Sequence, residues 1–129
     1  MPLTAMNETD YSFDPRLAHA RTPPAGWYFD PSMFAREKEK VFARTWQLVG
    51  RAEEVAEPGQ FFTATVGDEP VVVARGADSR LRALSNVCRH RAGPVAEGRG
   101  ACAAFRCGYH GWSYALDGRL TATPEWGGV

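Results

Sequence analysis

Short hydrophobic runs separated by glycine-containing turns dominate the chain from about residue 46 onward. Residues 61–66 and 71–75 flank Gly67-Asp68-Glu69-Pro70, an arrangement that predicts a β-hairpin. A closing hairpin is expected around Asp117-Gly118. The predicted strands cover residues 46–49, 61–66, 71–75, 81–87, 102–106, 112–116 and 119–120. Many short strands of this kind favour a mainly β fold, an antiparallel β-sandwich or barrel.

One helix is predicted before these strands. Asp30 is a suitable N-cap, and Pro31 fits the first helical position, where its missing N–H costs nothing. The helix is expected to end at about Arg44. Residues 1–26 are polar and contain four prolines, which predicts an arm without regular structure of its own. His19 in this arm is expected to be a solvated histidine.

Length and charge restrict the classes of function. The chain has 129 residues, of which 44% are hydrophobic, enough for one domain over residues 27–129. Fifteen basic and fifteen acidic residues give a formal charge of zero, which indicates no bulk attraction to nucleic acid or membrane. Without a long apolar run or a signal-peptide core in the sequence, a cytoplasmic location is expected.

Two Cys/His pairs carry the candidate chemistry. Cys88 and His90 form a Cys-x-His segment, and Cys107 and His110 form a Cys-x-x-His segment. This is the ligand pattern of a Rieske [2Fe–2S] site, in which two thiolates hold one iron and two imidazoles the other. The pattern predicts two ligand loops, 88–96 and 107–112, that form a small cluster-binding subdomain. Glycines in these loops allow the backbone to approach a cluster closely: Gly93, Gly108 and Gly111.

Two other interpretations of the same residues exist. The four side chains could bind structural zinc, although zinc sites usually pair Cys with Cys and His with His. A disulfide between Cys88 and Cys107 would need an oxidising compartment. The third cysteine, Cys102, has no histidine at ligand spacing and is expected to be a small strand residue.

The predicted ligand set defines what the site can do. Two ferric ions, two sulfides and two thiolates sum to a neutral core, and one added electron makes it a monoanion. Neutral imidazoles therefore favour reduction, and such centres lie at about −150 to +300 mV, against about −400 mV for plant-type ferredoxins. Protein and sulfide fill every iron position, so the sequence predicts a one-electron carrier. Arg89 and Arg91 in the first loop could favour the reduced cluster or bind an acidic redox partner.

The ligand segments, with the Leu116-Asp117-Gly118 turn, resemble the Rieske domain of aromatic-ring-hydroxylating oxygenase α subunits. The resemblance covers roughly residues 27–129 and includes the Phe42-Ala43-Arg44-Thr45-Trp46 segment and Pro58-Gly59. It implies that Cys88 and Cys107 bind one iron and that His90 and His110 bind the other. Gly108 replaces a proline that is common in the family.

The resemblance also suggests which residues surround the cluster. High-potential respiratory Rieske proteins carry a serine at the position of Trp112 and a loop-bridging disulfide at the positions of Gly93 and Tyr109. Tyr114 is retained as a possible hydrogen-bond donor. These differences predict a reduction potential near the low end of the Rieske range.

In the family, the complete subunit is an oxidoreductase, a mono- or dioxygenase whose mononuclear iron activates O2. Such an iron needs two histidines and a carboxylate, and after the cluster takes two histidines only His19 remains. The resemblance therefore implies the electron-entry domain of an oxygenase subunit, supplied by a reductase or ferredoxin and delivering electrons to a mononuclear-iron domain. The alternative is a stand-alone Rieske ferredoxin. A trimer is expected only with the catalytic domain, and the sequence does not separate aromatic from quaternary-amine substrates.

Overall fold

The computed structural model describes residues 11–124 of the chain, so the part of the predicted arm before Tyr11 lies outside the described residues. The chain forms two compact units, residues 1–45 and 46–129. No helix within residues 11–124 has the length and apolar character needed to cross a bilayer.

The described part of the N-terminal unit, residues 11–45, contains several helical turns. Where a polar arm was expected, its described part contains two 3-10 turns, η2 (Leu17–His19) and η3 (Ala25–Tyr28). Helix α1 (Pro31–Glu37) follows and continues as a wider π-helical turn, η4 (Lys38–Phe42). The Asp30 carboxylate accepts a hydrogen bond from the Ser32 N–H at 2.8 Å and so caps the helix N-terminus, while Pro31 occupies the first position.

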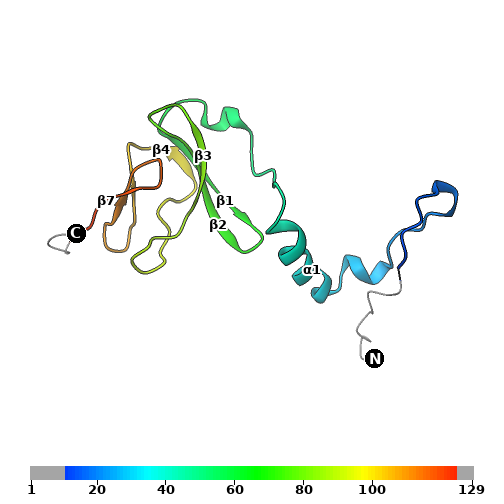
Figure 1. The fold of residues 1–129 in the computed structure, drawn as a ribbon. Helices are drawn as coiled ribbons and strands as arrows, with labels where there is room; N and C mark the ends of the chain where they lie inside the picture. Colours follow the sequence, from blue (N-terminus) through cyan, green and yellow to red (C-terminus); the bar gives the residue numbers. More distant parts are fainter. Residues whose placement is uncertain (1–10, 125–129) are drawn as a thin grey trace. The chain divides into compact units, whose positions relative to one another are not determined.

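The second unit contains two antiparallel sheets (Figure 1), so the expectation of a mainly β fold with one N-terminal helix is confirmed. The first sheet has the strand order β3-β2-β1-β4, and the second has the order β5-β6-β7. A 3-10 turn, η5 (Ala52–Val55), precedes the first sheet. The strands are β1 (Gln60–Val66), β2 (Glu69–Arg75), β3 (Leu81–Ser85), β4 (Arg99–Ala101), β5 (Phe105–Arg106), β6 (Ser113–Tyr114) and β7 (Leu120–Ala122).

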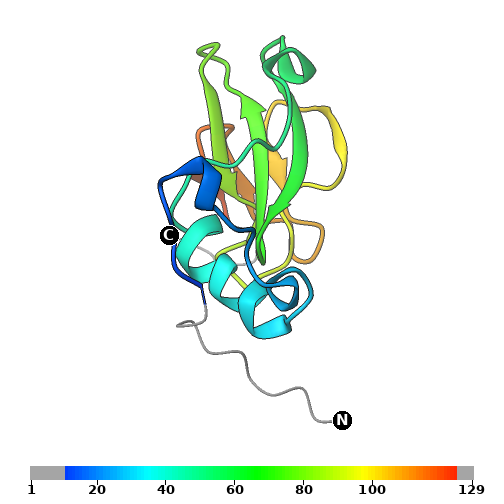
Figure 2. The same cartoon turned by 90° about the vertical axis from the view of Figure 1, so that its right-hand side faces the viewer.

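The two predicted hairpins are present. Strands β1 and β2 pair from Phe61–Ala74 to Val66–Glu69, and β1 to β3 lie side by side in Figure 2. Gly67 and Gly118, in the two hairpin turns, have φ of 61° and 89°, which favours glycine there.

Two strand predictions were wrong. Residues 46–49 form no strand: Trp46 and Leu48 are exposed, and no neighbouring strand pairs with them among the described residues. The strand predicted over residues 102–106 is limited to Phe105–Arg106, so Cys102 lies outside any strand, whereas the unpredicted β4 forms at Arg99–Ala101, where Arg99 pairs with Phe62 of β1. Residues 46–49 have the hydrophobic pattern of a strand but no pairing partner among the described residues, whereas residues 99–101 have a partner. The partner, rather than the local pattern, decides where a strand forms.

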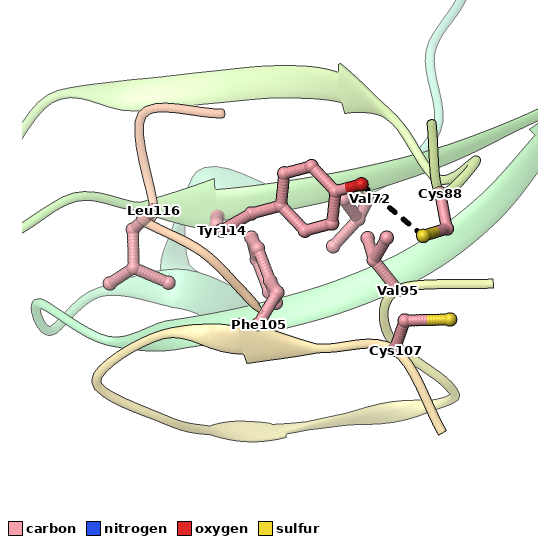
Figure 3. Packing of buried hydrophobic residues seen from close by; sticks show 8 residues of the cluster. Val72, Cys88, Val95, Phe105, Cys107, Tyr114 and Leu116 are labelled. Atoms are coloured by element: carbon pink, nitrogen blue, oxygen red, sulfur yellow. Dashed lines mark hydrogen bonds between the residues drawn. The ribbon is translucent and has the colours of Figure 1, made fainter. Parts of the chain in front are cut away.

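A hydrophobic core includes residues of both sheets (Figure 3). Val72 of β2, Phe105 of β5 and Tyr114 of β6 are each at most 6% exposed. Cys88 and Cys107 belong to the same cluster and lie together at one end of it. The core thus extends directly to the two predicted ligand loops.

Candidate metal centre

The two Cys/His segments form closed loops with the same backbone hydrogen bonds. In loop 1 (residues 88–93), the Cys88 N–H donates to the Gly93 carbonyl at 2.8 Å, and the Cys88 carbonyl accepts from the Ala92 N–H at 2.9 Å. In loop 2 (residues 107–112), the Cys107 N–H donates to the Trp112 carbonyl, and its carbonyl accepts from the Gly111 N–H, both at 2.9 Å. In each loop, these two hydrogen bonds therefore hold the backbone of the cysteine at the point where the loop closes.

A buried asparagine holds the chain on both sides of loop 1. Asn86 is 7% exposed, and its side-chain oxygen accepts from the N–H groups of Val95 and Ala96, both at 3.0 Å. Its side-chain nitrogen donates to the Ala96 carbonyl at 2.9 Å. Sequence reasoning missed this residue. The available signal was a polar amide two positions before Cys88, directly after β3.

The two cysteine side chains lie next to each other. Cys88 is 2% exposed and Cys107 is 3% exposed. The two side chains lie at the same end of the core, with the Cys88 sulfur directed toward the Tyr114 hydroxyl and the Cys107 sulfur pointing away from the core (Figure 3). A Cβ added to Gly93 would lie 3.5 Å from the Cys107 sulfur, so the backbone of loop 1 approaches the thiol of loop 2 closely.

The Tyr114 hydroxyl joins the closing hairpin to loop 1. It accepts a hydrogen bond from the Arg89 N–H at 2.9 Å and lies 3.2 Å from the Cys88 sulfur (Figure 3). Because the oxygen already accepts from Arg89, its own proton is available for the sulfur. Tyr114 is therefore placed as a hydrogen-bond donor to a Cys88 thiolate.

These contacts favour the thiolate, the form of cysteine that binds metal. Burial by itself would raise the pKa of the Cys88 thiol, but hydrogen bonds from the Tyr114 hydroxyl, the His90 backbone and the Cys107 side chain lower it overall. Burial and the neighbouring Cys88 raise the pKa of Tyr114, which keeps its hydroxyl protonated. The remaining thiol, Cys102, packs against the core outside the two loops, and burial raises its pKa.

The two imidazoles also come together from different loops. The ring centroids of His90 and His110 are 4.6 Å apart, with the planes at 65°. His110 Nδ1 is buried and has no hydrogen-bond partner among the described residues, which suits an atom that donates to a metal. The Trp112 ring stacks on His90, and the Tyr109 ring centroid lies 3.9 Å from the His110 ring centroid.

Within residues 11–124, no three or more His, Cys, Asp or Glu side chains form a group that could hold a single metal ion. A cluster with two protein ligands on each of two irons does not require such a group. The residues therefore suit a diiron cluster: two buried thiols at the same end of the core, two adjacent imidazoles, and a glycine where the backbone passes a sulfur.

Residues 45–129 match the Rieske [2Fe-2S] domain family. The chain belongs to this family. A Rieske domain carries a Rieske-type [2Fe–2S] cluster, and the donor set of the two loops fits that group.

Three similar proteins are oxygenases. The Rieske chain is 39% identical over 121 residues to choline monooxygenase, chloroplastic, of Spinacia oleracea, covering 89% of this chain and 28% of that protein. It is 40% identical to the glycine betaine monooxygenase oxygenase subunit of Chromohalobacter salexigens, covering 75% and 22%. The crystal structure of the quaternary ammonium Rieske monooxygenase CntA with L-carnitine superposes with a TM-score of 0.77 at 38% identity, covering 82% and 30%. The chain spans less than a third of each relative.

Proposed function

We propose that Cys88 and Cys107 hold one iron of the cluster, that His90 and His110 hold the other, and that the chain transfers single electrons. The observation that carries this proposal is that the two loops together supply two buried thiols at one end of the core and two imidazoles whose ring centroids are 4.6 Å apart, with one member of each pair from each loop. A [2Fe–2S] cluster supplies one reversible electron and leaves no iron position open for substrate.

Absorption and electron paramagnetic resonance spectra of the anaerobically purified 129-residue chain test this assignment. A reduced spectrum with a low average g value and hyperfine coupling to two histidine nitrogens supports mixed thiolate and imidazole ligation. A colourless chain containing stoichiometric zinc would identify a structural zinc module instead, and an all-cysteine signal would contradict the role of the histidines.

The surroundings of the two loops favour a reduction potential near the low end of the Rieske range. The Tyr114 hydroxyl contacts the Cys88 sulfur, and Trp112 supplies a ring where respiratory Rieske proteins carry a serine. Hydrogen bonds to sulfur raise the potential because they stabilise the added negative charge. A redox titration that gives a strongly positive midpoint would refute this expectation.

We further propose that the chain is the electron-entry domain of an oxygenase that acts on quaternary ammonium compounds. Choline monooxygenase, glycine betaine monooxygenase and CntA support this substrate class. The alternative is a stand-alone Rieske ferredoxin. The protein encoded by the full reading frame separates the two. If it hydroxylates choline, glycine betaine or carnitine, the oxygenase proposal is supported, whereas hydroxylation of benzene instead contradicts the substrate class. An encoded protein without a mononuclear-iron motif favours the ferredoxin. A cytoplasmic location stays a prediction.

The electron donor is proposed to be an acidic reductase or ferredoxin that binds beside loop 1. Arg89 and Arg91 are exposed, and neither forms an ion pair with an acidic side chain of residues 11–124. Attraction between opposite charges raises association rates most strongly at low salt.

Charge reversal tests this contact with a reduced, acidic plant-type ferredoxin as the donor. R89E/R91E should slow cluster reduction at low ionic strength, and the difference should disappear as salt is added. R80E is the matched control, because it reverses the charge of one arginine that is also exposed. Arg80 lies just before the start of β3, at the end of the strand away from loop 1. Equal rates for R89E/R91E and the wild type would end the proposal.

A further inference from the structure

Trp112 is fixed to the body of the second unit in two ways. Its carbonyl closes loop 2 by accepting the Cys107 N–H at 2.9 Å. Its half-buried side chain packs against the core cluster that contains Phe105 and Tyr114. The indole ring is therefore held both by the closure of loop 2 and by packing against the core.

The same indole ring lies flat against a histidine of the other loop. The centroids of Trp112 and His90 are 4.8 Å apart, and their planes differ by only 8°. The His110 ring approaches His90 at 65° to its plane, with the centroids 4.6 Å apart. Two aromatic neighbours from loop 2 thus define both the position and the plane of the loop 1 imidazole.

His110 has a different kind of neighbour. Its ring is accompanied by Tyr109, the preceding residue of its own loop, with the planes tilted by 32°. Tyr109 is 64% exposed, whereas Trp112 packs against the core. The contact to His110 is local and lies at the surface, while the contact to His90 crosses between the loops and is anchored.

We propose that Trp112 is a positioning residue for His90: by stacking across the loop boundary, it fixes the plane of the imidazole so that loop 2 orients both histidines. This inference rests on the proposed ligation by His90. Partners that orient a metal-bound histidine typically change metal affinity when they are removed. The stack gives loop 1, whose histidine lies only two residues after its cysteine, an external support for that side chain.

The experiment compares W112L, W112F and Y109L in the cluster-loaded 129-residue chain. One measurement is the rate at which a chelator removes iron from the oxidised chain. The other is the set of histidine nitrogen hyperfine couplings of the reduced chain, recorded by pulsed electron paramagnetic resonance. W112L removes the aromatic stack, W112F keeps a ring there, and Y109L is the matched control at the other histidine.

W112L should release iron about 10-fold faster than the wild type, a change at the lower end of those seen for residues that orient metal ligands. It should also change the couplings of one histidine and leave the other unchanged. W112F should stay close to the wild type in both measurements. Y109L should affect the other set of couplings. A W112L chain that does not load, beside a W112F chain that loads with wild-type spectra, also supports the proposal.

Wild-type couplings and iron release in W112L would overturn the inference. Equal defects in W112F and W112L would also overturn it, because the effect would then come from core volume or the indole nitrogen rather than from ring stacking. So would a Y109L change in the same couplings that W112L alters. If the wild-type chain itself shows no histidine coupling, the proposed ligation fails instead, which distinguishes the two results.

Discussion

The two ligand loops have the same hydrogen-bonded backbone but are supported by different surroundings. In each loop, the cysteine N–H donates to the carbonyl five residues later, and the residue four positions after the cysteine has a left-handed conformation. That residue is Ala92 in loop 1, with φ of 57°, and Gly111 in loop 2, with φ of 72°. The histidine falls at the third position of loop 1 and at the fourth of loop 2.

The space around the left-handed residue explains the different amino acids. Ala92 is exposed, so its Cβ is accommodated and only the backbone conformation is costly. A Cβ on Gly111 would lie 3.3 Å from the Arg106 guanidinium and 3.5 Å from Pro124. Both the left-handed backbone and the crowding therefore favour glycine at position 111, whereas only the left-handed backbone favours it at position 92. The comparison shows that the shared backbone sets the conformation, and local crowding decides which residue is tolerated.

The largest expected effect is common to both loops. H90A or H110A should abolish cluster assembly, since each removes one of two imidazoles proposed to hold an iron. C102A is the control and should retain the cluster, because Cys102 lies outside both loops. Iron content and the visible absorption of the purified chain measure the outcome. A stable cluster in either histidine variant would contradict the equivalence of the loops.

The next effect is specific to loop 1. N86A should lower the free energy of unfolding by about 2–4 kcal/mol, because it leaves the Val95 and Ala96 N–H groups buried without their acceptor. Urea unfolding of the cluster-loaded chain measures the loss. S85A, at the exposed neighbouring position, should change it by less than about 0.5 kcal/mol. Comparable losses in both variants would show that the side-chain hydrogen bonds of Asn86 have no special role in stability.

G111A tests the crowding in loop 2. It should cost about 1–2 kcal/mol for the left-handed backbone, with an additional penalty from the contact to Arg106. The urea midpoint and the fraction of cluster-loaded protein are the measurements. The double variant G111A/R106A should recover part of the loss, and no recovery would mean that backbone strain alone is responsible.

Y114F removes the hydroxyl that contacts the cysteine of loop 1. Losing one hydrogen bond to the Cys88 sulfur, worth about 1 kcal/mol, should lower the midpoint potential by roughly 40 mV for a one-electron couple. The direction follows because the hydroxyl stabilises the more negative, reduced state. Protein-film voltammetry measures the midpoint. A potential that rises or stays unchanged would show that the hydroxyl does not donate to the ligand sulfur.

The smallest effect is expected for A92G. Glycine removes a left-handed strain of about 1–2 kcal/mol but adds roughly 0.5–1 kcal/mol of backbone entropy in the unfolded chain. The net result should be a stabilisation between about 0 and 1.5 kcal/mol, detectable as a small increase in the urea midpoint. A clear destabilisation would mean that the Ala92 side chain makes a contact that its exposure does not suggest.

Much of the local structure followed from the sequence because its causes are local. Asp30 and Pro31 specify a helix start through the cap and the fixed proline φ, and Gly67 permits the tight turn between β1 and β2. Residues 46–49 and β4 were mispredicted because strand formation depends on a partner. Arg99–Ala101 shows no hydrophobic alternation and pairs because the edge of β1 is available.

By itself, the sequence determined the chemistry of the site. Two cysteines and two histidines at this spacing predict a mixed-ligand diiron cluster, since residue type and loop length alone decide which atoms are available for iron. The tertiary structure decided what supports them: the Asn86 clamp, the Tyr114 hydrogen bond and the Trp112 ring over His90. Each of these contacts joins segments that are distant in the chain or belong to different loops, and only folding brings such segments together.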